Sequence, residues 1–149
     1  IFPLYYSGQT KFMPIHCSDL TDIIYKIISN KIYSNIIECV GPEVLTFKEI
    51  LKKLLKLIGK RRMLLSLPLP IANLTAIFFQ LLPKPLLTTD QLKLLKYDNI
   101  LSGKYKTNSD IGVPATKVFY DEVKKYSYMW REGGQFSTEK YKLKDNIDS

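Results

Sequence analysis

The segment from Ile36 to Lys60 restricts the possible fold more than any other part of this sequence, because every local signal in it agrees. It opens with β-branched residues and reaches Gly41-Pro42, which predicts a short buried strand that ends in a turn. Thr46 and Glu49 then have the spacing of a capping box, and Gly59 is a typical helix stop. The segment therefore predicts a strand, a turn and a capped helix.

The predicted helix after Thr46 is amphipathic. One face carries the apolar residues Ile50, Leu51, Leu54, Leu55 and Ile58, and the other carries Lys48, Lys52, Lys53 and Lys56. Lys60, Arg61 and Arg62 follow the stop, where cations interact favourably with the carbonyl end of a helix. The same three side chains are also candidates for contact with phosphate or an anionic lipid.

The residues before this segment predict two short strands, residues 1–6 and 12–17, joined by a turn at Ser7-Gly8-Gln9. Ser18 or Asp19 is placed to cap a helix that ends near Asn30, and we expect Asp19 to have no other role. A strand, a helix and then the strand at 36–40 predict a right-handed crossover between parallel strands, hence an α/β fold that is rich in helices and contains a few short, partly parallel strands.

The run from Met63 to Pro83 contains no charged residue and is long enough to suggest a membrane span. Pro68 and Pro70 interrupt it, however, so we expect a buried or interfacial helix between Pro70 and Pro83 and no transmembrane segment.

Two further helices are predicted in the second half of the chain. Thr88 and Gln91 repeat the capping-box pattern ahead of a helix that reaches Tyr97, and Thr116 is placed to cap a last helix that runs toward Trp130. We expect residues 1–132 to form one domain and residues 133–149 to be a disordered tail. The first residue is Ile1 and not Met, so we expect a C-terminal part of a longer protein.

The net charge of +8 raises three classes of partner, namely nucleic acid, anionic lipid and phosphate-bearing ligands, although a generally basic surface that aids solubility would explain it as well. No specific nucleic-acid site is expected, because the aromatic residues are not interleaved with a dense basic groove. Cys17 and Cys39 form no CxxC motif, which indicates neither a disulfide framework nor a zinc site and favours a reducing compartment.

The usual catalytic patterns are missing from the sequence. It has one histidine, His16, and no GxSxG, HExxH, P-loop or GxGxxG motif. We therefore expect no catalytic residue and no metal site in this chain, and no enzymatic activity from the chain alone.

Four stretches in this order carry a resemblance: SGQTKFMPIHCSDLTDII, IIECVGPEVLTFKEILKKL, LLTTDQLKLLKYDNIL and DIGVPATKVF. They resemble the C-terminal half of the extended and atypical short-chain dehydrogenases/reductases, which belong to the NAD-dependent epimerase/dehydratase superfamily. Within that superfamily they look most like the NAD(P)H-binding accessory subunit of respiratory complex I (NADH-ubiquinone oxidoreductase) and its bacterial relatives.

The resemblance implies the C-terminal half of a Rossmann-like fold that closes over NAD(P)H and docks on complex I subunits or on an anionic membrane surface. The cofactor would be held mainly by an N-terminal region absent from this chain. The location implied is the bacterial cytoplasm or the mitochondrial matrix, peripheral to the inner membrane. Two alternatives stay open, a non-catalytic docking module and a nucleotide-sugar epimerase or reductase. Phe12 disfavours the last, since such epimerases usually place an arginine there to bind the substrate diphosphate.

The candidate site residues fall into two groups. His16 is a candidate for contact with the cofactor, although a lone histidine at a strand end is more often structural. Lys60, Arg61, Arg62 and Lys11 are candidates for contact with an anion or a membrane.

Overall fold

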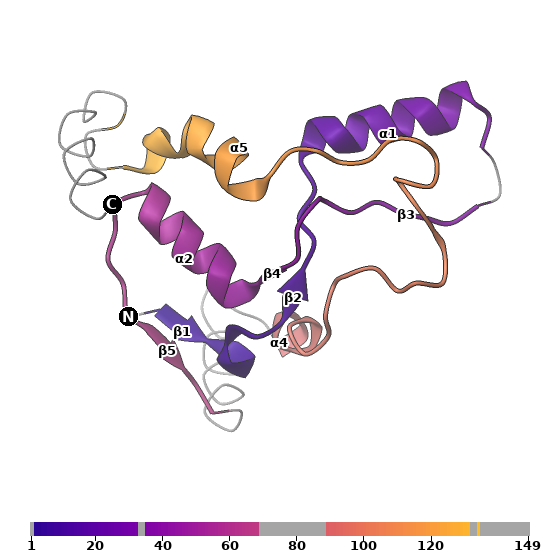
Figure 1. Cartoon of the computed structure of the whole chain (residues 1–149). Helices are drawn as coiled ribbons and strands as arrows, with labels where there is room; N and C mark the ends of the chain where they lie inside the picture. The colour runs from indigo at the N-terminus through magenta and orange to yellow at the C-terminus, as the bar shows by residue number, and fades with distance from the viewer. Residues whose placement is uncertain (1, 33–34, 69–88, 132–133, 135–149) are drawn as a thin grey trace.

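The structure is a computed structural model that describes residues 2–32, 35–68, 89–131 and 134 (Figure 1). Its helices are α1 (Cys17–Ser29), α2 (Phe47–Leu57), α4 (Thr89–Leu94) and α5 (Phe119–Tyr126). Its strands are β1 (Phe2–Leu4), β2 (Lys11–Phe12), β3 (Ile37–Glu38), β4 (Leu45–Thr46), β5 (Leu64–Ser66) and β6 (Lys106–Thr107). Two 3-10 turns cover Tyr5–Gly8 and Ser127–Trp130. The described part is thus mixed α/β and rich in helices.

The strands pair as three separate two-stranded sheets. β1 is parallel to β5, with Phe2 opposite Leu64, and β3 is parallel to β6. β2 is antiparallel to β4. The expectation of a few short, partly parallel strands is therefore confirmed for the described residues.

The predicted crossover between parallel strands at 12–17 and 36–40 is wrong. β2 pairs with β4 instead, and the extended residues after β2 meet the second strand segment through one backbone hydrogen bond, from the Gly41 N–H to the Met13 carbonyl at 3.3 Å. The next residue is Pro14, which has no N–H to donate, so a ladder cannot continue there.

α2 forms as the sequence predicts. The Glu49 N–H donates to Thr46 Oγ1 at 3.2 Å, and the Thr46 N–H donates to Glu49 Oε2 at 2.7 Å, which completes the capping box. At the other end Gly59 has φ of 67°, and the Lys60 N–H donates to the Leu55 carbonyl. This is a Schellman stop, in which glycine adopts the left-handed conformation without steric cost.

The predicted caps of α1 and α5 are wrong. α1 begins at Cys17, two to three residues earlier than a cap at Ser18 or Asp19 predicts, and its N-cap is His16, while α5 begins at Phe119 after Val118 with no side-chain cap. At α1, the Asp19 carboxylate accepts N–H groups of the residues before α5 and not those of its own helix. At α5, the helix begins two residues later than a cap at Thr116 would place it.

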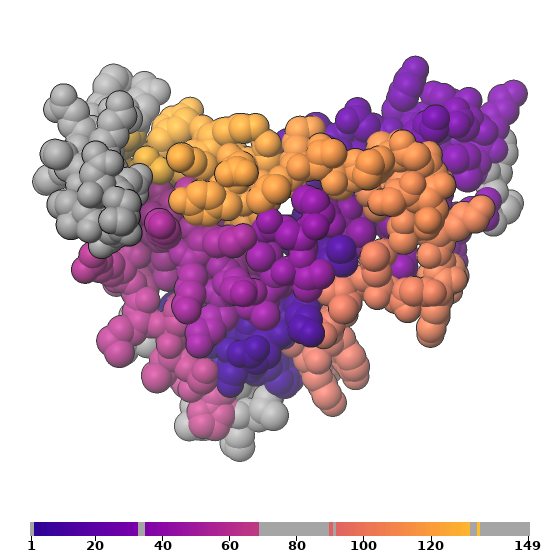
Figure 2. Space-filling view, viewed as in Figure 1, coloured from indigo at the N-terminus to yellow at the C-terminus, as the bar shows by residue number. Residues whose placement is uncertain are grey.

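Burial is uneven among the described residues. A small core forms around Tyr5 and Leu92, and α1 contributes the fully buried Ile23. On the same helix Ile24 and Ile28 are exposed, so the apolar stripe of α1 is only half covered. α5 lies along α2 (Figures 1 and 2), and the side chain of Arg131, just after the 3-10 turn that follows α5, donates from Nε to the Leu57 carbonyl at the end of α2.

Three sequence predictions fall outside the described residues: the helix between Pro70 and Pro83, the cap formed by Thr88 with Gln91, and the tail at 133–149, of which only residue 134 is described. Of the helices in the described ranges, none has both the length and the apolar character needed to cross a bilayer.

Candidate functional site

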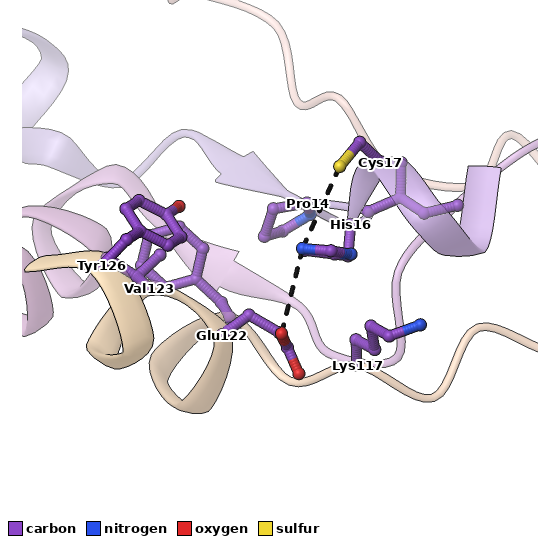
Figure 3. A pocket seen from close by; sticks show the side chains of 9 residues that line it. Pro14, His16, Cys17, Lys117, Glu122, Val123 and Tyr126 are labelled. Atoms are coloured by element: carbon purple, nitrogen blue, oxygen red, sulfur yellow. Dashed lines mark hydrogen bonds and ion pairs between the residues drawn. The ribbon is translucent and has the colours of Figure 1, made fainter. Parts of the chain in front are cut away.

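His16 lies in a pocket of about 380 Å³ between the start of α1 and the inner side of α5. Figure 3 shows its ring between Cys17 and Glu122, with Tyr126 at the far side. The remaining wall is mostly apolar and includes Pro14, Ile15, Phe119 and Val123. The volume is in the range of small-molecule sites, although near its lower end.

The position of His16 is determined by its role as the N-cap of α1. The Ser18 N–H donates to His16 Nδ1 at 3.2 Å, so Nδ1 carries the lone pair and the neutral ring carries its proton on Nε2. Nε2 lies 3.8 Å from Glu122 Oε2 and 4.0 Å from Cys17 Sγ. The proton of the ring therefore points into the pocket, where it can be donated to a ligand.

This arrangement does not pair Cys17 with a base. The nitrogen nearest to the Cys17 thiol is a donor in the neutral ring and cannot accept the thiol proton. Glu122 is also held as a carboxylate, because the hydrogen bond from Lys125 at 2.6 Å lowers the pKa of Glu122 below its usual value. The pocket geometry thus suits binding better than nucleophilic or acid–base chemistry.

Beside this pocket, Asp19 holds the segment before α5 in place. One carboxylate oxygen accepts the N–H groups of Thr116 and Lys117 at 3.1 and 3.0 Å, and the other accepts Lys117 Nζ at 2.9 Å. Burial alone would raise the pKa of Asp19, but the bonds from Lys117 and Thr116 outweigh burial, so this pKa lies below its usual value. Asp19 is therefore a tertiary clamp, and the expectation that it has no role beyond an N-cap is wrong.

The residues from Thr10 to Asp19 form a hub that bonds to all three other motif segments. The Phe47 N–H donates to the Thr10 carbonyl at 2.8 Å. The Met13 N–H donates to the Asn99 carbonyl, and the Thr10 hydroxyl to the Leu95 carbonyl. Asp19 completes the hub by accepting the N–H of Thr116, which lies in the last of the four stretches. Each of the other three stretches that carry the family resemblance thus contacts the first stretch somewhere along residues 10–19.

Two residues near the hub have tertiary roles that the local sequence does not show, although Gly41 is expected in a turn. A Cβ on Gly41 would lie 1.8 Å from the Pro14 carbonyl oxygen, so only glycine fits there. Asn108 is buried, and its amide accepts the Val40 N–H and donates to the Val113 carbonyl, each at 3.2 Å. The sequence contains no spacing signal for either, because each acts on a segment remote along the chain.

The second candidate region is an open groove of about 760 Å³ along α2 and the residues that follow it. Six basic residues line it: Lys48, Lys52, Lys56, Lys60, Arg61 and Arg62. The apolar residues Leu55, Met63 and Leu64 complete the lining. The structure thus brings the candidate residues Lys60, Arg61 and Arg62 together with three lysines of the basic face of α2, which the sequence did not include among the candidate site residues.

Lys11 and Phe12 lie elsewhere, on β2. Lys11 is exposed, its N–H donates to Asp98 Oδ1 at 2.8 Å, and it does not line the groove. Phe12 is half buried with its ring 6.3 Å from that of Phe47. Lys11 is therefore separate from the cluster of cations with which it was predicted.

Comparison with known proteins assigns no family. No protein-family model matches the chain, and a search of curated proteins finds no relative. Among the residues that the structure describes, no group of three His, Cys, Asp or Glu side chains is placed to hold a metal ion.

Proposed function

We propose that this chain is the C-terminal part of an NAD(P)(H)-binding, oxidoreductase-like subunit of the extended or atypical short-chain dehydrogenase class, with a Rossmann-like parent fold. Its role is to close the cofactor cleft and to dock on partner subunits, in particular those of an NADH:quinone oxidoreductase. The proposal places the protein in the bacterial cytoplasm or mitochondrial matrix, peripheral to the inner membrane.

The observation that carries the proposal is the hub at Thr10 to Asp19. The resemblance consists of four separated stretches in a given order, and a chance similarity gives no reason for them to be in contact. Here the first stretch bonds to each of the other three, through partners up to 98 residues away. The stretches behave as one structural unit, as the cap of such a fold requires.

The described residues fit a small part of the cofactor only. The pocket at His16 offers one inward donor, while Lys117 beside it is already bonded to Asp19. The pyrophosphate of a dinucleotide is normally bound by a glycine-rich turn at a helix N-terminus, a motif that this sequence lacks. In the proposal, the residues of this chain close over the cofactor and exclude water, and the bound dinucleotide supplies the redox chemistry.

The test is calorimetric titration of the complete gene product with NADH and with NADPH. We expect saturable binding of at least one of them. Absence of binding heat, together with absence of a glycine-rich loop after the first strand of the complete protein, would overturn the proposal.

A variant of His16 tests its contact with the cofactor. Asn is also a good N-cap residue, so His16→Asn keeps the cap of α1 and removes only the imidazole. A weaker affinity for the dinucleotide with unchanged thermal stability would assign His16 to the cofactor cleft. Unchanged affinity would limit His16 to its capping role.

A docking module with no chemistry of its own is the second candidate function. The groove along α2 favours it, because six cations gathered on one open surface serve no evident purpose within the described fold.

A further inference from the structure

The cations of the groove form an extended row. Lys48, Lys52 and Lys56 are four residues apart on α2, so they lie on one side of the helix over about 12 Å. The row continues into Lys60, Arg61 and Arg62 beyond the Schellman stop. Such a row is too long for a single phosphate ion and matches an extended anionic surface.

None of these cations forms a close ion pair with a carboxylate within the described part of the chain, although Lys52 adds to the effect of the Thr46 hydrogen bonds in lowering the pKa of Glu49. The ion pair of α2 joins Lys53 to Glu43, and Lys53 does not line the groove. Glu49 is committed to Thr46 at the helix start. Like charges four residues apart on a helix repel one another, so the bare row is unfavourable and an anion in the groove would relieve it.

The groove also has an apolar lining. Leu55 and Leu64 are half buried there, and Met63 is 73% exposed at the end of the cationic row. Inorganic phosphate or pyrophosphate offers nothing to these side chains. A phospholipid surface offers phosphate to the cations and acyl or glycerol carbons to Met63, which is the combination used by proteins that bind at a membrane interface.

We infer that the groove lined by Lys48, Lys52, Lys56, Lys60, Arg61, Arg62 and Met63 is a docking site for the anionic phospholipid headgroups of a bilayer. This inference deepens the docking part of the proposed function and is independent of dinucleotide binding.

The test is co-sedimentation of the full chain with vesicles made of equal parts phosphatidylcholine and phosphatidylglycerol, compared with vesicles of phosphatidylcholine alone. We expect binding to the anionic vesicles only, weakened by added salt. One basic residue near such a surface contributes about fivefold in affinity. Replacing Lys52, Lys56 and Arg61 together by Gln should therefore weaken binding on the order of 100-fold.

A matched control removes the same charge elsewhere. Lys104, Lys106 and Lys124 are exposed and do not line the groove, so their joint replacement by Gln should change the affinity by less than about threefold. All six positions are on the surface, and circular dichroism melts would show that both variants are folded. Equal weakening of the two variants would overturn the inference, because it would show that only net charge matters.

Two more measurements separate the lipid from other anions. Met63→Ser should weaken vesicle binding and leave the binding of inorganic pyrophosphate unchanged. Binding of pyrophosphate or of polyglutamate without binding of anionic vesicles would assign the groove to a soluble anion or to an acidic protein and overturn the inference. Since dinucleotide binding is titrated separately, failure on vesicles leaves the NAD(P)H proposal standing, and the converse also holds.

Discussion

Replacing Asp19 by Ala should destabilise the protein far more than its position near the start of a helix suggests. The substitution leaves three donors without their acceptor: the N–H groups of Thr116 and Lys117, and Lys117 Nζ. Asp19 is only 6% exposed, whereas the Lys117 side chain is 32% exposed and can regain water. Counting the two backbone bonds at about 1.5 kcal/mol each gives a loss of about 3 kcal/mol in the free energy of unfolding.

The pH dependence of this loss identifies the charge as its cause. The pKa of Asp19 is lower in the folded state than the value of about 3.9 expected when unfolded, so its contribution is present above pH 3.9 and is lost as the pH falls through the folded pKa. The hydrogen bond to Asp19 also raises the pKa of Lys117, so the same pair weakens when the pH rises through that raised pKa. The difference between wild type and Asp19→Ala should be largest near neutral pH.

Urea unfolding followed by circular dichroism, from pH 7 down to pH 3, measures this difference. Asp19→Asn retains one acceptor oxygen without the charge and should lose about 1–2 kcal/mol. Asp22→Ala is the control, because Asp22 is exposed on the same helix, and its effect should stay within about 0.5 kcal/mol. Equal losses for Asp19→Ala and Asp22→Ala, or a loss that does not change with pH, would refute the clamp.

Three other substitutions test the packing around the hub and the start of α2 by the same unfolding assay. Gly41→Ala forces a Cβ against the Pro14 carbonyl and should lower the free energy of unfolding by more than about 3 kcal/mol. The control is Gly103→Ala, at φ of 73° in open space, which should lower it by only about 1–2 kcal/mol. Similar losses for the two variants would contradict the steric argument. Asn108→Ala removes a buried amide that accepts one hydrogen bond and donates another, so the free energy of unfolding should fall by about 2–3 kcal/mol. A fall of less than about 1 kcal/mol would show that water replaces the amide. Thr46→Ala removes the capping box of α2 and should cost about 1 kcal/mol, with reduced helical signal in circular dichroism; no change would mean that packing alone positions the helix.

The parts of the fold that the sequence predicts well are those whose causes lie within a few residues. The capping box at Thr46 and Glu49 and the stop at Gly59 involve partners at most five residues away, and both form as predicted. The sequence also shows the cluster of basic residues after this stop, because charge is visible in sequence. The path of the chain after α2 places these residues in the same groove as Lys48, Lys52 and Lys56, and local rules do not determine that path.

The mispredicted features depend on partners remote in sequence. An aspartate near a helix start predicts a cap, but here Thr116 and Lys117, nearly one hundred residues later, take its carboxylate, and His16 takes over the cap. Likewise the crossover rule assumes that strands next to a helix pair with each other. In this chain the N–H missing at Pro14 stops that ladder after a single bond, so β2 pairs with β4.

The clamp at Asp19 also has a consequence for how the chain is made. Asp19 and Lys117 are 98 positions apart, so at synthesis rates of about 5–20 residues per second the partner follows the carboxylate by roughly 5–20 s. During that interval the Asp19 carboxylate has none of the three donors that it binds in the folded protein. The start of α1 and the segment before α5 can therefore be joined only after nearly all of the described residues have been synthesised.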